Sequence, residues 1–288
     1  MDLKELRNEI DRIDDQLVQL FAQRMEVSAR IADYKKENGL PIFVPTREQE
    51  KLQDVAQKAG PEMEIYTKAL YAMLFELSRG YQSQRNATLT ALYHQISEAI
   101  RSTEKRLPRQ EAVGCFTAGN EEPHLVCQKL FATNPVLDFK HIQGLLNALS
   151  QGLCRYGILP LDHNTHQIYD LLAQQQLYIV RTIRLADHRQ YLCISRQMEI
   201  YPGADRCSIR AALADHPGAL YKVLARLYTL GINVTHLESR PVTDKNFRAM
   251  FYFDLEISVY SEEFILLICE LGDLCEEFAY LGSYTEVF

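Results

Sequence analysis

Long hydrophobic runs and an excess of positive charge are missing from this chain of 288 residues, and each absence excludes a class of function. No segment approaches the roughly 18 consecutive apolar residues that a membrane-spanning helix needs. The formal net charge of −7 argues against nucleic acid or an anionic membrane as the main partner. The first ten residues, MDLKELRNEI, are charged rather than apolar, so no secretory signal is expected and a cytoplasmic location is predicted.

Cysteine pairs and histidine clusters are also scarce. The seven cysteines all lie after residue 100, and no two of them form a C-x-x-C motif. This pattern is typical of a reducing compartment, in which thiols serve as small apolar side chains, so no disulfide is predicted. His163 and His166 stand three residues apart but lack a third ligand at a suitable spacing. They are interpreted as exposed loop histidines, and no metal site is predicted.

What the chain does contain is a globular composition with 47% hydrophobic and 24% charged residues, and its length allows two or three domains. Apolar residues recur at helical spacing over residues 3–38. A helix from Arg47, capped by Thr46, and a third helix from residue 62 to at least residue 84 should follow, with a continuation through residue 100 left open. Residues 1–100 are therefore predicted to form an all-α domain, and the polar residues 101–110 a linker.

The first helix would be about 54 Å long, which a compact unit of roughly 85 residues cannot cover. Its long apolar stripe needs another chain, so the segment predicts an intertwined homodimer.

The pattern changes after residue 110. Residues 111–200 alternate short strands with helices and predict a small α/β domain. Residues 201–288 predict the order strand, helix, strand, strand, helix, strand, which is the βαββαβ plan of a ferredoxin-like α+β domain. The fold class is thus multidomain, with an all-α domain, a small α/β domain and a ferredoxin-like domain.

Several polar residues in the first 85 positions have spacings that suit a ligand. Arg24 and Lys35 lie three helical turns apart and share a face, as do Ser78 and Gln82 at i and i+4. A folded chain rarely turns permanent charges inward unless a ligand or partner neutralises them, and such a set suits a small polar dianion. The candidate catalytic residues are Arg7, Arg24, Lys35, Arg47, Glu48, Ser78 and Gln82.

This series, with Leu77-Ser78-Arg79, resembles the all-helical chorismate mutase family over nearly all of residues 1–85. The resemblance implies that chorismate is rearranged to prephenate by a pericyclic step without a cofactor, so catalysis rests on positioning and charge stabilisation. It also implies that Arg24 and Arg7 hold the two substrate carboxylates, with Arg7 coming from the partner subunit.

The resemblance assigns the other residues in turn. Lys35 and Gln82 would donate to the ether oxygen of the substrate, and Glu48 would accept from its hydroxyl group. Arg47 would help to position the substrate, and Ser78 would contact a carboxylate or hydroxyl. Val44 departs from the pattern, because many relatives carry aspartate there, and turnover could be weaker as a result.

The middle segment resembles the first lobe of prephenate dehydratase, through Gly114-Cys115-Phe116, residues 156–162 and residues 168–172. An intact dehydratase has two such lobes, and this chain has room for about one. The family's Thr-Arg-Phe signature is absent from the sequence. Because a cleft enzyme that lacks one wall cannot exclude water, dehydratase activity is expected to be lost.

Residues 206–286 resemble the ACT domain of dehydratase-type proteins. Pro217-Gly218 makes a tight turn that opens a helix and can accept a carboxylate on its N–H groups, and Asn233 and Glu238 could bind an ammonium group. The resemblance implies paired ACT domains with an amino-acid effector, phenylalanine in dehydratase relatives. The alternative is a dimerisation scaffold. The candidate effector residues are His216, Pro217, Gly218, Ala219, Leu220, Asn233, Glu238 and Ser239.

Three functions follow from these resemblances. The first is a chorismate mutase regulated by phenylalanine, with the middle domain as a spacer. The alternatives are a bifunctional mutase–dehydratase and a non-catalytic amino-acid-binding protein whose mutase domain only dimerises. Dimer versus tetramer and the direction of a phenylalanine effect are left open.

Overall fold

The chain folds into two compact units, residues 1–88 and residues 89–288, in the computed structural model. Each unit is described by itself. The structure describes residues 2–41, 44–86, 90–117, 121–161, 165–185, 189–214, 216–242 and 248–287. Among the helices described, none combines the length and apolar character that crossing a bilayer requires.

The first unit contains three helices, α1 (Leu3–Glu37), α2 (Pro45–Ala59) and α3 (Glu64–Asn86), and α3 packs against the other two. The predicted long first helix is confirmed. It starts with a capping box in which the Asp2 side chain accepts from the Glu5 backbone N–H and the Glu5 side chain accepts from that of Asp2. The predicted start of the second helix was wrong: Val44 is the N-cap and Pro45 is the first residue, a position that the fixed φ of proline favours.

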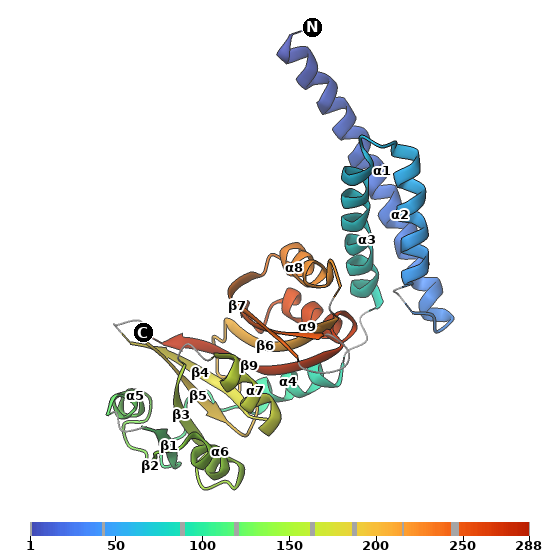
Figure 1. The fold of residues 1–288 in the computed structure, drawn as a ribbon. Helices are drawn as coiled ribbons and strands as arrows, with labels where there is room; N and C mark the ends of the chain where they lie inside the picture. Colours follow the sequence, from blue (N-terminus) through green and yellow to red (C-terminus); the bar gives the residue numbers. More distant parts are fainter. Residues whose placement is uncertain are drawn as a thin grey trace. The chain divides into compact units, whose positions relative to one another are not determined.

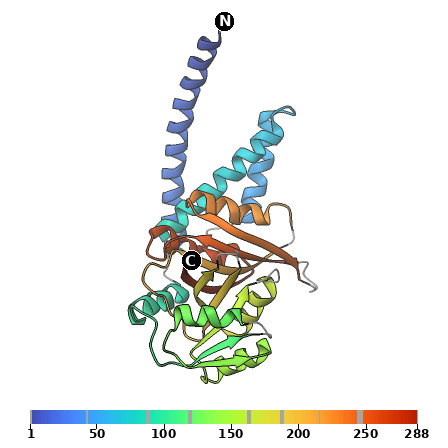
Figure 2. The same ribbon diagram turned by 90° about the vertical axis from the view of Figure 1, so that its left-hand side faces the viewer.

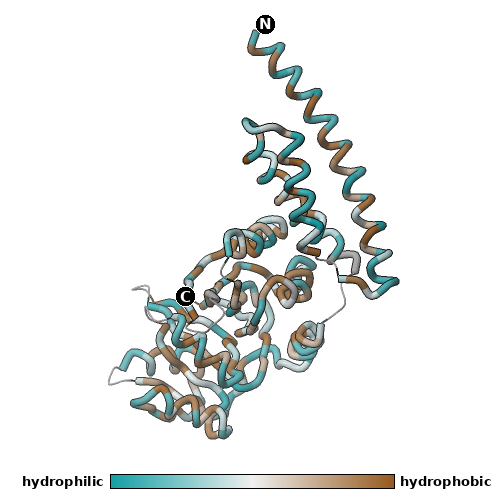
Figure 3. Tube along the Cα trace, turned by 45° about the vertical axis from the view of Figure 1, so that its right-hand side comes forward, coloured by the Kyte–Doolittle hydropathy of each residue, from teal (hydrophilic) through white to brown (hydrophobic). Residues whose placement is uncertain are grey.

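Most of the apolar side chains of α1 lie on the surface. The helix buries only the small residues Ser28, Ala29 and Ala32. Its N-terminal half extends beyond α2 and α3, and it carries apolar residues along its length (Figures 1 and 3). We call six of its exposed apolar residues the α1 stripe: Leu3, Leu6, Ile10, Ile13, Leu17 and Leu20. No described residue of the same unit buries this stripe.

The second unit is built on one nine-stranded mixed sheet in the order β2-β1-β3-β5-β4-β9-β6-β8-β7 (Figures 1 and 2). The strands are β1 (Val113–Phe116), β2 (Val136–Phe139), β3 (Tyr156–Leu161), β4 (Tyr178–Arg184), β5 (Gln190–Ser195), β6 (Arg206–Ala214), β7 (Asn233–Pro241), β8 (Arg248–Glu256) and β9 (Glu277–Val287). The predicted α/β segment supplies β1 to β5, and the predicted βαββαβ order is confirmed in β6 to β9 with their two helices.

Six helices flank this sheet: α4 (Ala91–Ser102), α5 (Glu122–Leu130), α6 (Ile142–Ser150), α7 (Thr165–Gln175), α8 (Ala219–Thr229) and α9 (Glu262–Leu274). Helices α8 and α9 pack with β6 and β8 in one apolar core, which also takes up Ile96 and Ala99 of α4. A second core joins α6 and α7 to residues of β6, β8 and β9. The sequence placed α4 in the helical domain, but its apolar face packs against α9 and it belongs to the second unit.

The α/β strands and the ferredoxin-like strands meet where β4 pairs in parallel with β9. Gly282 makes this meeting possible: its φ of 137° strains any other residue, and a Cβ there would lie 2.2 Å from the Ile179 carbonyl oxygen. The sequence suggested two separate domains on either side of residue 200, whereas the structure shows one continuous sheet. A boundary motif such as Tyr201-Pro202-Gly203 marks a turn, and it carries no information on strand pairing across it.

Candidate active site

Six of the seven candidate catalytic residues line one cavity of about 300 Å³ in the helical unit. They come from all three helices: Arg24 and Lys35 from α1, Arg47 and Glu48 from α2, and Ser78 and Gln82 from α3. The cavity is also lined by Ser28, Ile31, Val44, Lys51, Phe75 and Arg79. The sequence spacing thus identified a set of side chains that the fold brings together.

Arg24 is held rigidly within the cavity wall. Its Nη1 donates to the carbonyl oxygen of Leu74 at 3.1 Å and also to Oγ of Ser78, while Ser78 in turn donates to the Leu74 oxygen at 2.7 Å. The guanidinium carbon lies 5.9 Å from the centre of the Phe75 ring. Burial lowers the pKa of Arg24, but from so high a starting value that the group remains a cation.

Lys35 and Glu48 are oppositely charged residues that line the same cavity. Burial lowers the pKa of Lys35, and the nearby Glu48 carboxylate partly opposes that shift. Glu48 is ion-paired with Arg79, which is also ion-paired with Glu76. Arg79 belongs to the motif Leu77-Ser78-Arg79, but no role was predicted for it from the sequence. Its spacing of three residues from Glu76 on α3 was an available signal for a positioning pair, but nothing in the sequence linked it to Glu48 on α2.

Gln82 and Ser78 are polar residues in a buried position, with exposed fractions of only 7% and 5%. Oε1 of Gln82 has no hydrogen-bond partner among the residues described. A buried amide oxygen without a partner is costly, so the position favours a group that a ligand completes.

Arg47 and Arg7 lie less deeply. Arg47 is at the rim, strongly exposed, with Nη1 3.7 Å from Oε2 of Glu50. Arg7 is not part of the cavity: seventeen residues before Arg24 on the same helix, it lies about 25 Å away along the axis. Within one chain, Arg7 therefore cannot reach a ligand that Arg24 holds.

The candidate effector residues fall at two ends of the ferredoxin-like strands. Gly218, with φ 90°, is the N-cap of α8 and follows the end of β6. Because β6 and β7 both run antiparallel to β8, the end of β7 with Glu238 and Ser239 lies on the same side as this turn. Asn233 begins β7 and donates to Oε2 of Glu256 at 3.0 Å, about 17 Å from Glu238 along the strand.

The other residues of the turn are only partly engaged. His216 and Pro217 are exposed, with Nδ1 of His216 lying 3.1 Å from the Pro217 carbonyl oxygen, and Ala219 and Leu220 are half-buried at the start of α8. Glu238 is already paired, since its Oε1 lies 2.8 Å from Nδ1 of His166 and 3.0 Å from Nη2 of Arg240. The structure therefore does not join Asn233 and Glu238 into one ammonium site within a chain.

Histidines and cysteines, the side chains most often used as transition-metal ligands, occur at several positions in the second unit. His166 was predicted to be an exposed loop residue, and this was wrong: its side chain is 15% exposed, in α7. His163 lies outside the described residues. The seven cysteines are free thiols. In the described part of the chain, one group could hold a metal: Cys115, His124 and Asp138 have ligand atoms within 4.8 Å of one another. Because Nε2 of His124 and Oδ1 of Asp138 already lie 2.7 Å apart, these two groups satisfy one another without an ion.

Two protein families match this chain at the regions just described. The chorismate mutase type II family matches residues 6–83, and the ACT domain family matches residues 208–259. The protein is thus an enzyme of the class that carries a chorismate mutase domain, a dehydratase-like α/β region and an ACT domain.

Individual relatives extend this picture. The chain is similar to the bifunctional chorismate mutase/prephenate dehydratase of Aquifex aeolicus, with 24% identity over 374 aligned positions that cover 99% of this chain and 98% of that protein. It is 40% identical to the T-protein of Haemophilus influenzae over 77 residues, 26% of this chain and 20% of that one. The fold resembles the prephenate dehydratase of Arthrobacter aurescens in complex with L-Phe, with a TM-score of 0.51, 14% identity and coverage of 60% and 89%.

Proposed function

We propose that the helical unit converts chorismate to prephenate, and that the cavity around Arg24 is where the reaction takes place. The observation that carries the proposal is the convergence of Arg24, Lys35, Glu48 and Gln82 from three helices on one cavity. Chorismate is a dianion with an ether bond and a hydroxyl group, and each of these groups finds a matching side chain there.

The chemistry needs no covalent step, so the site acts by orientation and electrostatics. Arg24, held by Ser78 and the Leu74 carbonyl oxygen, binds one carboxylate of the folded substrate. Lys35 and Gln82 donate to the ether oxygen, where negative charge grows as the C–O bond breaks. Glu48, oriented by Arg79, accepts from the substrate hydroxyl.

The second carboxylate is bound by Arg7 of a partner subunit. The α1 stripe supports this assignment, because it leaves a long apolar surface uncovered along the same half of α1 that carries Arg7. Two copies of α1 packed along this stripe would cover it and bring the partner's Arg7 toward the cavity. A homodimer is therefore the smallest active form, and a tetramer would add pairing through the ACT domains.

The sheet unit has lost dehydratase activity and regulates the mutase by binding phenylalanine near the turn of Gly218. The loss of dehydratase activity is supported by the single α/β lobe and by the missing Thr-Arg-Phe signature. Because Asn233 and Glu238 lie far apart within one chain, an effector that uses both would have to lie between two chains.

The experiment is a set of rate measurements on the full-length protein. Loss of chorismate absorbance should be fast in the wild type and strongly reduced in Gln82→Leu, while added prephenate should give no phenylpyruvate. Saturating phenylalanine should change the mutase rate. If the coupling acts on the affinity for chorismate, a change of about 5–150-fold is typical. Formation of phenylpyruvate would establish the bifunctional alternative. Absence of mutase turnover would support the non-catalytic alternative.

A further inference from the structure

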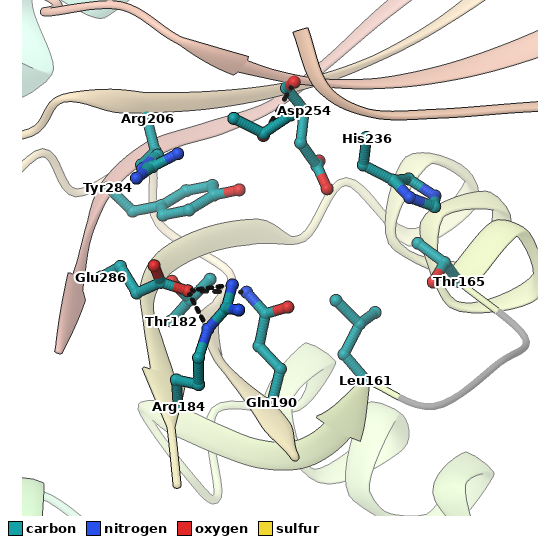
Figure 4. A pocket seen from close by; sticks show the side chains of 11 residues that line it. Leu161, Thr165, Thr182, Arg184, Gln190, Arg206, His236, Asp254, Tyr284 and Glu286 are labelled. Carbon is teal, nitrogen blue, oxygen red and sulfur yellow. Dashed lines mark hydrogen bonds and ion pairs between the residues drawn. The ribbon is translucent and has the colours of Figure 1, made fainter. Parts of the chain in front are cut away.

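A second cavity, of about 450 Å³, lies inside the sheet unit where the α/β strands meet the ferredoxin-like strands. Figure 4 shows Arg206, Tyr284, Asp254 and His236 on one side and Arg184, Gln190 and Leu161 on the other. The volume is within the range of small-molecule sites. None of the seven candidate catalytic residues or the eight candidate effector residues lines it.

Two arginines and two carboxylates line this cavity, and they are not equally well paired. Arg184 and Glu286 neutralise one another, with Nη2 and Nε of the arginine 2.9 and 3.0 Å from Oε1 of the glutamate. Asp254 accepts from Ser208 at 2.6 Å and from Tyr169 at 2.7 Å, and burial raises its pKa.

Arg206 is less well compensated than Arg184. Its Nη2 lies 3.7 Å from Oε1 of Glu256, and its buried Nε has no hydrogen-bond partner in the described structure. The unpaired Nε therefore leaves Arg206 with a donor from which an anionic ligand can accept.

Two further polar atoms at the cavity are unsatisfied. The hydroxyl of Thr182, a residue only 1% exposed, has no hydrogen-bond partner among the residues described. Nε2 of His236 also lacks a hydrogen bond there, although Oε2 of Glu238 lies 3.9 Å from it. Leaving such groups buried and unpaired costs stability, so their presence at the wall of a cavity points to a ligand that completes them. The ring of Tyr284 and the side chain of Leu161 add an apolar wall.

We infer that this cavity binds a small organic carboxylate with a ring-sized apolar body, through Arg206, Thr182 and His236. Such a ligand would contact the α/β strands and the ferredoxin-like strands at once and so stabilise the seam between them. An oxo acid and an amino acid share this chemistry. They differ in the ammonium group, which the cavity does not require and the proposed effector site does.

The test is calorimetric titration of the full-length protein with phenylpyruvate and, separately, with L-phenylalanine. Phenylpyruvate should bind at one site per chain, because it lacks the ammonium group that the effector site is proposed to hold. Phenylalanine bound at the cavity would show the same dependence on Thr182 and Arg206, which distinguishes it from phenylalanine bound near Gly218. Chorismate turnover is measured alongside, so that failure of the mutase proposal is seen independently.

Two variants and a control make the test decisive. Thr182→Val and Arg206→Gln should each weaken binding about tenfold or more, as expected for a hydrogen bond to a charged group. Thr182→Val should also raise the melting temperature of the ligand-free protein, because it removes an unpaired hydroxyl. Arg196→Gln, the same charge change at an exposed side chain outside the cavity, should leave binding unchanged. Absence of binding by both probes at millimolar concentration, or binding insensitive to both variants, would overturn the inference.

Discussion

In the helical unit the large apolar side chains of α1 lie on the surface, with Leu3 63% and Ile10 56% exposed, whereas the sheet unit buries rings such as Tyr169 and Phe253 completely. The helical unit gathers polar side chains around a cavity and leaves the α1 stripe exposed. The sheet unit is self-sufficient, with helices packed on both faces of the ferredoxin-like strands. The difference is the one expected if the helical unit functions as the proposed dimer, whereas the sheet unit is held together by the pairing of β4 with β9.

The largest expected effect is at the centre of the helical unit. Arg24→Ala should lower kcat/KM for chorismate by about 10²–10³-fold, because it removes the preorganised cation that is proposed to bind the substrate dianion. The measurement is chorismate absorbance against time, with circular dichroism to show that the helices remain. Arg30→Ala, an exposed arginine on the same helix, is the matched control. A comparable loss in both variants would contradict the assignment.

The second largest effect is expected on the stability of the sheet unit, at the pairing of β4 with β9. Gly282→Ala should destabilise that unit by about 2–4 kcal/mol, because a Cβ meets the Ile179 backbone and φ is unfavourable. Thermal unfolding of the full-length protein should show one transition shifted down while mutase activity persists at low temperature. Gly272→Ala, a helical position where an added Cβ meets nothing within 4 Å, should be neutral or slightly stabilising. Equal shifts would show that the close approach at Gly282 does not matter.

The pH dependence of the mutase should reveal Lys35. Its pKa is lowered by burial, and in its proposed role it can donate to the ether oxygen only when protonated. The rate should therefore be full below the lowered pKa and fall by about tenfold per pH unit above it, starting at a lower pH than an ordinary lysine would give. Lys35→Arg should keep its charge and abolish this alkaline decline, at some cost in rate. A decline that persists in Lys35→Arg would assign it to another group.

The smallest effect is expected at Val44, which is the N-cap of α2 without a side-chain hydrogen bond. Val44→Asp should stabilise the helical unit by about 1 kcal/mol, because a carboxylate can accept from the first N–H groups of the helix. It should also raise turnover, since Val44 lines the catalytic cavity. Val44→Ala should do neither, and a gain from alanine would attribute the effect to removal of the valine instead.

The sequence predicted those features that depend on local spacing. The period of apolar residues identified α1, and the alternation after residue 206 identified the βαββαβ order. The spacing of charged and polar residues on two helices selected Arg24, Lys35, Ser78 and Gln82, which line one cavity. In each case one face of one element carries the information.

Features that depend on contacts between distant segments were not predictable. Strand β2 is short and lies at the edge of the sheet, and its four residues give a weak alternation. The packing of α4 on α9, the pairing of β4 with β9 and the ion pair of Arg79 with Glu48 each join residues that no local pattern connects. The cavity at the seam follows from that strand pairing, and so it too appears only in the folded chain.

The central claim, that each active site combines Arg24 of one chain with Arg7 of its partner, is tested most directly by mixing two inactive variants. Arg7→Ala and Arg24→Ala homodimers are unfolded together, refolded as a mixture and assayed with chorismate. Half of the refolded dimers are hybrids, and each hybrid has one intact site of two, so activity should return to about a quarter of the wild-type value. No recovery from a mixture that has re-formed dimers would show that Arg7 does not act across the interface.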